Sequence, residues 1–361
     1  MKELQNVELI KLFSSEIKKA TKKPIRLMIL SGSQYVLSVE HKLSSLLPEN
    51  VELVPGPACA NCLLSPTFID QTLAYCHHEN IIITTFDHLA DIPGSVSTLR
   101  KEKNNGADIR IVESLMDALL IAKRSRRKKV VFPGYGFENS ATITAGTIIQ
   151  AQMAGLKNFY VFGDYKLLPP VMKTLFIRKT NIDGYIVPCD ISLITGTKCY
   201  KSLPIAYGKG IVVSGNDLTD LLQSILMLVY QSKNHNPTVE TECTGGITPD
   251  GDIKAQQLIE EVFETTDTEW PGLGKIADSG LKIRDTYAMH RAETNIDVDL
   301  TPYRGDETGC VCGEILTAAK TPEDCPLFGK ECTPQAPAGA CMASAEGACF
   351  ASYIYGQQKI L

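Results

Sequence analysis

The sequence predicts an α/β protein in which two similar parallel-sheet domains face a cleft, followed by a cysteine-rich C-terminal domain. Two observations predict this class. Short β-branched runs alternate with helical patterns up to about residue 232, and strands alternating with helices are typical of parallel sheets. Beyond residue 300 the chain is instead rich in cysteine, glycine and proline. A single (β/α)₈ barrel is the alternative for the first part.

The elements follow one another regularly. Eight runs are expected as strands: 25–30, 51–56, 80–86, 108–114, 130–136, 158–164, 183–189 and 210–215. Helical patterns separate most of them and include 65–78, 114–125, 140–155 and 217–231. Eight strands divide naturally into two groups of four. The expected domains are therefore 1–127, 128–232 and a C-terminal domain over 233–361, in which a helix is expected at 255–264.

Composition and charge restrict the class of protein. The chain has 361 residues, of which 44% are hydrophobic and 21% charged, and its net charge is -5. These values are ordinary for a soluble globular protein and argue against nucleic acid as the main partner. Neither a signal peptide nor an apolar run of membrane-spanning length is visible, so a cytoplasmic location without membrane association is expected. In reducing cytoplasm, clustered cysteines more often bind metal or do redox chemistry than form structural disulfides.

The C-terminal cysteines are the strongest chemical signal. Of the 12 cysteines, six fall within residues 310–349. Four of them, Cys325, Cys332, Cys341 and Cys349, are separated by turns rich in glycine and proline. Four thiolates on a winding loop favour a 4Fe–4S cluster, with structural zinc or unligated thiols as alternatives. Cys310 and Cys312 are either alternative ligands or a second thiol pair.

A second signal is "GPACANC" over residues 56–62. Cys59 and Cys62 lie just before Ser65 and Pro66, which are a good N-cap and first residue for a helix. A helix N-terminus lowers the pKa of a nearby thiol, and parallel sheets place their sites beyond the carboxyl ends of the strands. The pair is therefore interpreted as a redox dithiol or a soft-metal site in the cleft, with a buried pair of no chemical role as the alternative.

Glu138 is a third candidate. It lies in "GYGFENSAT", between an expected strand and a helix whose N-cap is expected to be Ser140. There it would orient a metal ligand or move a proton. The alternative is a carboxylate that only complements the helix dipole. Of the histidines, His88 is the one expected near the site, because it follows a strand. Lys166 and Asp190 are expected on the opposite wall of the cleft, or else in solvated loops.

Taken together, these segments resemble the HypD family of nickel–iron hydrogenase maturation proteins. The resemblance is carried from about residue 25 to the C-terminus by "LLPENVELVPGPACANC", "IPGSVSTLR", "GADIRIVES", "KLLPP", "WPGLGKIADSGLKIR" and "DCPLFGKECTPQAPAGACMASAEGAC", among others. It implies two α/β domains around a cleft and a third domain that holds a 4Fe–4S cluster. It further implies a HypC-type small chaperone and a HypE-type cyanide donor as partners in building an iron–cyanide–carbonyl centre. Cys59 and Cys62 match the redox-active pair of the family, and Cys325, Cys332, Cys341 and Cys349 match its cluster ligands.

The sequence departs from this family at the iron site. The family pattern Cys-Gly-Thr-His reads here as "SGSQ", which places Ser31 and Gln34 at degenerate metal-binding positions. A family Gly-His reads as Cys189 followed by aspartate. A hydroxyl is a far poorer ligand than a thiolate for low-spin ferrous iron.

Two functions therefore stay open. The first is a HypD-type scaffold and electron relay that holds a mononuclear iron in the cleft through other ligands, such as Cys189 or the Cys59/Cys62 pair. The alternative is a divergent iron–sulfur and dithiol oxidoreductase without cyanide chemistry, or a non-catalytic paralogue.

Overall fold

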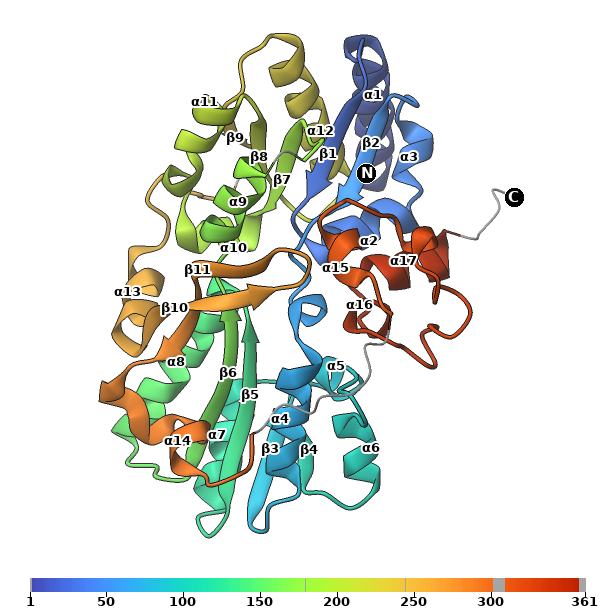
Figure 1. Ribbon diagram of the computed structural model, residues 1–361. Helices are drawn as coiled ribbons and strands as arrows, with labels where there is room; N and C mark the ends of the chain where they lie inside the picture. Colours follow the sequence, from blue (N-terminus) through green and yellow to red (C-terminus); the bar gives the residue numbers. More distant parts are fainter. Residues whose placement is uncertain (1, 179, 244, 301–308, 357–361) are drawn as a thin grey trace.

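The computed structural model of the protein describes residues 2–178, 180–243, 245–300 and 309–356 (Figure 1). Within these ranges the strands form two separate sheets, one of five strands and one of six, with helices packed around them. The chain is therefore an α/β protein, as expected. No helix in the described part of the chain is long and apolar enough to cross a membrane.

The first sheet is entirely parallel and has the order β2-β1-β7-β8-β9. Its strands are β1 (Ile25–Ile29), β2 (Val51–Pro55), β7 (Gly184–Pro188), β8 (Gly210–Ser214) and β9 (Val239–Thr241). Every residue of β7 and β8 is buried, which explains why their sequences read as continuous apolar runs rather than as alternating ones.

The second sheet has the order β10-β11-β6-β5-β3-β4. Its parallel strands are β3 (Ile81–Thr85), β4 (Ile109–Ile111), β5 (Lys129–Gly136) and β6 (Phe159–Lys166). An antiparallel hairpin, β10 (Phe263–Trp270) and β11 (Gly274–Ile283), extends this sheet through antiparallel pairing of β11 with β6.

All eight expected strands are present, but their expected grouping is wrong. The chain leaves the first sheet after β2, builds β3 to β6, and then returns for β7 and β8. The sheets are therefore not separated along the chain at residue 127, and the barrel alternative is also wrong for the described residues. Hydrophobic periodicity identifies a buried strand, but it does not say which strand lies beside it.

The β10–β11 hairpin was not expected either. The sequence "FETTDTEW" of β10 alternates between more and less exposed residues, and its two ends, Phe263 and Trp270, are buried. This two-residue periodicity indicates a strand. It is shown by threonine and acidic residues, however, rather than by β-branched aliphatic residues. The hairpin and the preceding helix, which packs on α8, attach residues 253–283 to the second sheet.

The helices connect the strands and cover the sheets. The α-helices are α1 (Lys2–Ala20), α2 (Gly32–Glu40), α3 (Leu43–Leu46), α4 (Pro66–Cys76), α5 (Asp87–Ala90), α6 (Leu99–Asn104), α7 (Leu115–Arg124), α8 (Glu138–Met153), α9 (Leu168–Ile177), α10 (Cys189–Thr195), α11 (Ser202–Tyr207), α12 (Leu218–Lys233), α13 (Ile253–Val262), α14 (Ala292–Asn295), α15 (Cys312–Leu316), α16 (Ala340–Ala343) and α17 (Ala348–Tyr355). The 3₁₀ helices are η1 (Asn61–Leu63), η2 (Lys198–Tyr200), η3 (Asp285–His290) and η4 (Pro322–Asp324).

Two expected helix starts have different outcomes. Ser65 caps α4, where its Oγ accepts a hydrogen bond from the Phe68 N–H at 3.1 Å. Ser140 is not a cap, because α8 begins two residues earlier, at Glu138. The chain turns sharply at Gly136, whose φ is 112°, and such a positive φ is readily adopted by glycine. The helix therefore starts directly after the turn.

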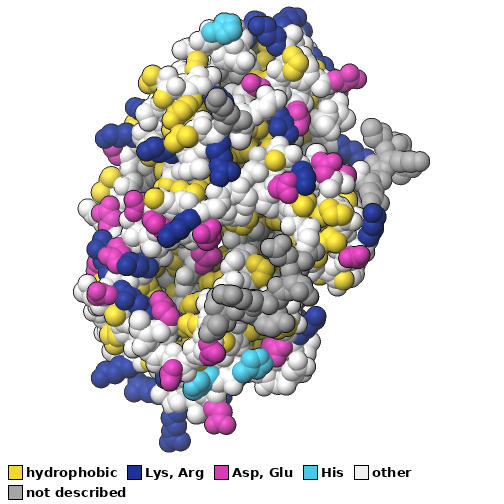
Figure 2. All heavy atoms as spheres, in the orientation of Figure 1, with side chains coloured by type: hydrophobic (Ala, Val, Ile, Leu, Met, Phe, Trp, Pro, Cys, Tyr) yellow, Lys and Arg dark blue, Asp and Glu magenta, His cyan; other side chains and the backbone are white. Residues whose placement is uncertain are grey.

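The described part of the cysteine-rich segment, residues 309–356, is called here the C-terminal lobe. Its helix α17 packs on α2 and its helix α16 packs on η1, and Figure 1 shows it beside the first sheet. Its buried cysteines belong to the same apolar core as Cys59 and Cys62. On the face shown in Figure 2, basic and acidic side chains are interspersed over most of the surface.

Candidate redox and metal-binding site

Cys59 and Cys62 are joined by a disulfide directly before α4. Both cysteines are buried. The backbone N–H of Cys62 also donates to the sulfur of Cys59 at 3.2 Å. The pair lies beyond the carboxyl end of β2, where parallel sheets commonly place their sites.

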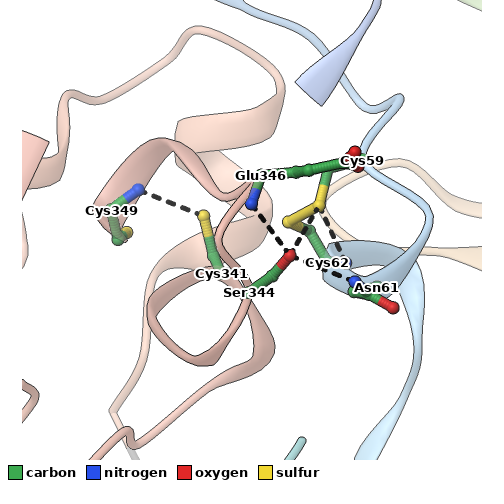
Figure 3. Close-up of a disulfide and its surroundings, with 7 residues drawn as sticks. All are labelled: Cys59, Asn61, Cys62, Cys341, Ser344, Glu346 and Cys349. Carbon is green, nitrogen blue, oxygen red and sulfur yellow. Dashed lines mark hydrogen bonds between the residues drawn. A yellow bond between two sulfur atoms is a disulfide. The ribbon is translucent and has the colours of Figure 1, made fainter. Parts of the chain in front are cut away.

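The disulfide touches the C-terminal lobe (Figure 3). The sulfur of Cys59 lies 3.6 Å from the Ser344 hydroxyl, and the Asn61 side-chain amide donates to that hydroxyl at 3.2 Å. The Glu346 N–H donates to the same oxygen at 3.2 Å. Ser344 therefore stands between the disulfide and the lobe, and it lies three residues after Cys341.

A third segment meets the same point. Gly32, the first residue of α2, is packed so closely that a Cβ there would lie 2.8 Å from the Glu346 carbonyl oxygen and 2.9 Å from the Cys59 Cβ. The loop after β1, the disulfide segment and the C-terminal lobe thus converge at one position. Residues far apart in the sequence form a single site.

The lobe gathers six cysteine thiols. Cys325, Cys332, Cys341 and Cys349 are buried, whereas Cys310 and Cys312 are partly exposed. Two backbone N–H groups point at sulfur atoms: that of Cys349 at Cys341, and that of Ala338 at Cys332, each at 3.3 Å. Among the described residues, no three His, Cys, Asp or Glu side chains are placed to hold a single metal ion.

These thiols influence one another strongly. The pKa of Cys341 lies well below its ordinary value, because the thiols of Cys312 and Cys349 donate hydrogen bonds to its sulfur. The pKa values of Cys312 and Cys349 are raised, first by the same interaction with Cys341 and then by burial. Cys341 is therefore the thiol of this group that most readily carries negative charge.

A cavity of about 520 Å³, called here the cleft, opens beside the disulfide segment. It is bounded by residues that follow β1, β2, β5, β7 and β8, so both sheets contribute to its wall. Its polar lining includes Ser31, Gln34, Asn139, Cys189, Asp190 and Glu346. The charged residues in its described lining, Asp190 and Glu346, are both acidic.

Ser31 and Gln34, the two degenerate positions, both line the cleft. Ser31 is the N-cap of α2 and its hydroxyl lies 3.1 Å from that of Ser33. Gln34 is only 1% exposed, and its amide donates to the carbonyl oxygens of Ser214 and Gly215 at 2.9 and 2.6 Å. Its Oε1 is buried and has no hydrogen-bond partner. Gln34 thus fastens the end of β8 and leaves one acceptor unsatisfied.

Glu138 does not line the cleft, although its neighbours Phe137 and Asn139 do. Its Oε1 accepts a hydrogen bond from the Leu168 N–H at 3.0 Å, at the start of α9. Its Oε2 is buried without a partner, and burial raises the pKa of Glu138 to about 7. Lys166 does not line the cleft either. Its ammonium group forms an ion pair with Asp164 at 2.7 Å. Asp190 does line the cleft, and Asn139 donates to its carboxylate at 2.8 Å.

A second cavity of about 540 Å³ shares Ala60, Ser140 and Glu346 with the cleft. His88 lines this second cavity and does not line the cleft itself. Burial lowers the pKa of this histidine.

Sequence reasoning missed Ser344, Glu346 and Cys243. Ser344 and Glu346 follow no motif, and only the packing of the lobe brings them to the disulfide. Cys243 follows no motif either, but its thiol interacts with that of Cys189. The approach of these two residues depends on the pairing of β7, β8 and β9, which the sequence does not display.

Fold and site together define a two-sheet α/β protein whose cysteine-rich lobe is fastened to a disulfide beside an acidic cleft. Comparison with known proteins identifies the family. The HypD family model, described as the hydrogenase formation hypA family, matches residues 8–356. The chain belongs to the HypD family of hydrogenase maturation proteins.

Individual relatives agree with this assignment. Hydrogenase maturation factor HypD of Escherichia coli is 36% identical over 359 residues, covering 99% of this chain and 96% of that protein. Hydrogenase maturation factor HypD2 of Bradyrhizobium diazoefficiens is 37% identical over 345 residues, covering 93% and 90%. HypD of Cupriavidus necator is 38% identical over 337 residues, covering 91% and 88%. The function of this chain is therefore of the HypD maturation type.

Proposed function

We propose that this protein is a scaffold and electron relay for assembly of the iron–cyanide–carbonyl centre of nickel–iron hydrogenase. In this proposal the cleft holds the iron while its ligands are attached. A HypC-type chaperone and a HypE-type cyanide donor are the partners, and the cytoplasm is the location.

The observation that carries the proposal is the contact of 3.6 Å between the Cys59 sulfur and the Ser344 hydroxyl. Through it, the segment between Cys341 and Cys349 touches the disulfide. Reduction of this disulfide to two thiols takes up two electrons and two protons. A resident 4Fe–4S cluster would supply electrons when bound, and the disulfide is an electron acceptor in contact with the lobe that would hold it.

The cysteines of the lobe fit such a cluster. Cys325, Cys332, Cys341 and Cys349 are buried together, and backbone N–H groups point at two of their sulfurs. Hydrogen bonds to the sulfurs are one of the means by which proteins tune iron–sulfur clusters. Because each iron of a cluster takes its own cysteine, the four thiols need not converge on a single ion.

The cluster is tested by iron and sulfide analysis of anaerobically purified protein. About four irons and four acid-labile sulfides per chain are expected for this cluster type. Cys332→Ala should lose them and loosen the lobe, since metal binding in such a segment contributes folding free energy. Cys199→Ala is the matched control, because Cys199 is an exposed free cysteine outside the lobe. Stoichiometric zinc without sulfide would contradict this part of the proposal.

The scaffold is tested by infrared spectroscopy after anaerobic co-purification with a HypC-type partner. Bands from iron-bound cyanide and carbon monoxide are expected, and Cys59→Ser should weaken them. If both bands are absent, the double substitution Ser31→Cys with Gln34→His asks whether the missing ligands are the cause. Absence of bands even then would reject the scaffold.

One observation favours the second candidate function, a HypD-like dithiol oxidoreductase without cyanide chemistry. Ser31 and Gln34 line the cleft at the degenerate positions and offer a hydroxyl and an amide oxygen instead of a thiolate and an imidazole. If this second function is correct, the Cys59–Cys62 disulfide should be reduced and re-formed reversibly. The protein should then show no infrared bands from iron-bound cyanide or carbon monoxide.

A further inference from the structure

Two thiols at the carboxyl edge of the first sheet belong neither to the disulfide nor to the C-terminal lobe, and one of them lines the cleft. Cys189 follows β7 and lines the cleft. Cys243 follows β9, and its thiol is hydrogen-bonded to that of Cys189. Both are free and partly exposed. They lie 54 positions apart in the sequence, so only the sheet brings them together.

The register of the first sheet fixes this juxtaposition. Pro188 at the end of β7 lies opposite Ser214 of β8, and Val213 of β8 lies opposite Thr241 of β9. The end of β8 therefore lies between the residues that follow β7 and those that follow β9. Cys243 reaches this end, since its sulfur lies 3.8 Å from the Val213 carbonyl oxygen. Cys189 and Cys243 thus flank the end of β8 at the carboxyl edge of the sheet.

The surroundings of the pair favour a cation. The Glu242 carboxylate lies 3.7 Å from the Cys243 sulfur and also accepts a hydrogen bond from the Gly215 N–H. Asp190 follows Cys189 directly and lines the cleft. No lysine, arginine or histidine occurs among the described residues that line the cleft. The carboxylates thus lie beside the thiols without a basic residue of the cleft lining to offset them. Burial raises the pKa of both thiols, so a cation would have to displace their protons when it binds.

An independent feature points to the same place. Gln34 is 1% exposed, lines the cleft and holds Gly215 through its amide, while its Oε1 has no partner. A buried acceptor without a donor costs free energy, and a bound cation or its water would satisfy it. The Gln34 amide donates a hydrogen bond to the Gly215 carbonyl oxygen, and the Gly215 N–H donates one to the Glu242 carboxylate. Both side chains are therefore positioning residues for the end of β8.

We propose that Cys189 and Cys243 form a two-thiol metal site at the end of β8, beside the cleft, which binds a soft or borderline divalent cation such as ferrous iron. Thiolate sulfur is the donor type that such cations prefer over hydroxyl or amide groups. The remaining ligands of such an ion would be water or small molecules from the cleft, which Cys189 lines. The inference rests on the proposed role of the cleft as the place where iron is held.

Cobalt(II) is a suitable probe, because it follows ferrous iron closely in ligand preference and its thiolate complexes absorb visibly. Anaerobic protein with its cluster in place is titrated with Co²⁺. One thiolate-bound Co²⁺ per chain is expected for the unaltered protein and for the control Cys199→Ser. Loss of a group that only orients a metal ligand typically lowers metal affinity by roughly 10- to 100-fold. Cys189→Ser and Cys243→Ser each remove a ligand itself, so each should lower the Co²⁺ affinity by more than that.

A second measurement does not depend on the variants folding. Maleimide labelling of the unaltered protein, read by mass spectrometry, should show that Co²⁺ protects Cys189 and Cys243 but leaves Cys199 reactive. Equal labelling with and without Co²⁺ would overturn the proposal, as would unchanged Co²⁺ affinity in the double variant.

Infrared spectra separate this inference from the scaffold function. Cyanide and carbonyl bands that survive in the Cys189→Ser, Cys243→Ser double variant would refute the thiol pair while the scaffold stands. Co²⁺ bound by the pair would support the site even if the bands are absent from both the unaltered protein and the Ser31→Cys, Gln34→His variant, an outcome that rejects the cyanide chemistry alone.

Discussion

Substitution of Gly32 by alanine tests whether α2, the disulfide segment and the C-terminal lobe are locked together. The added Cβ would meet the Glu346 carbonyl oxygen at 2.8 Å and the Cys59 Cβ at 2.9 Å. Both distances are shorter than van der Waals contact. One neighbour is backbone and the other belongs to a disulfide, so neither is the free end of a flexible side chain. One of the three segments must move.

The expected cost is that of overpacking a tight contact, about 1–3 kcal/mol. This corresponds to roughly a 5-fold to 150-fold change in the unfolding equilibrium. Because the strain is relieved most easily by displacing the lobe, amide hydrogen exchange should increase over residues 340–350 more than in the sheets. Urea unfolding followed by circular dichroism measures the stability, and mass spectrometry measures the exchange.

Gly146→Ala is the matched control. Gly146 lies inside α8, and a Cβ there meets no atom within 4 Å. Alanine in a helix interior should stabilise the protein by about 0.4–1 kcal/mol. If Gly32→Ala unfolds at the same urea concentration as the unaltered chain and leaves exchange in the lobe unchanged, the convergence of the three segments at Gly32 is refuted.

Three further substitutions test individual interactions. Ser65→Ala removes the cap of α4 and should cost about 1 kcal/mol, while Ser65→Asp should retain most of the stability in the same urea titration. Ser344→Ala removes the acceptor of the Asn61 amide and should cost about 1–3 kcal/mol because that buried group loses its partner; an unchanged thermal midpoint would contradict the contact. Glu138→Gln should flatten the pH dependence of stability. Burial raises the pKa of Glu138 in the folded protein to about 7, above the unfolded value near 4.3. The stabilisation that this group contributes is therefore fully present below pH of about 4.3 and is lost as the pH rises through about 7. A decline in stability over this range that persists in Glu138→Gln would show that another group titrates.

The sequence allowed much of the local structure to be predicted. The strand at 210–215 was found because its residues are continuously apolar, and the start of α4 because Ser65 and Pro66 are a strong helix signal. The candidate status of Cys59 and Cys62 followed from their spacing and from the helix after them. The start of α8 was misplaced at Ser140, because a glycine that turns the chain matters more there than a good capping residue.

The sequence by itself determined the alternation of strands and helices, the cysteine pairs and clusters, and the family to which the chain belongs. These properties depend on residue type and on spacing along the chain, which a linear sequence records. Only the tertiary structure decided that β7 and β8 return to the first sheet, that Ser344 touches Cys59, and that Cys189 meets Cys243. Each of these contacts joins residues far apart in the chain. Such contacts are selected by the packing of whole sheets and lobes, because burial of apolar surface is non-directional and does not specify neighbours through local sequence.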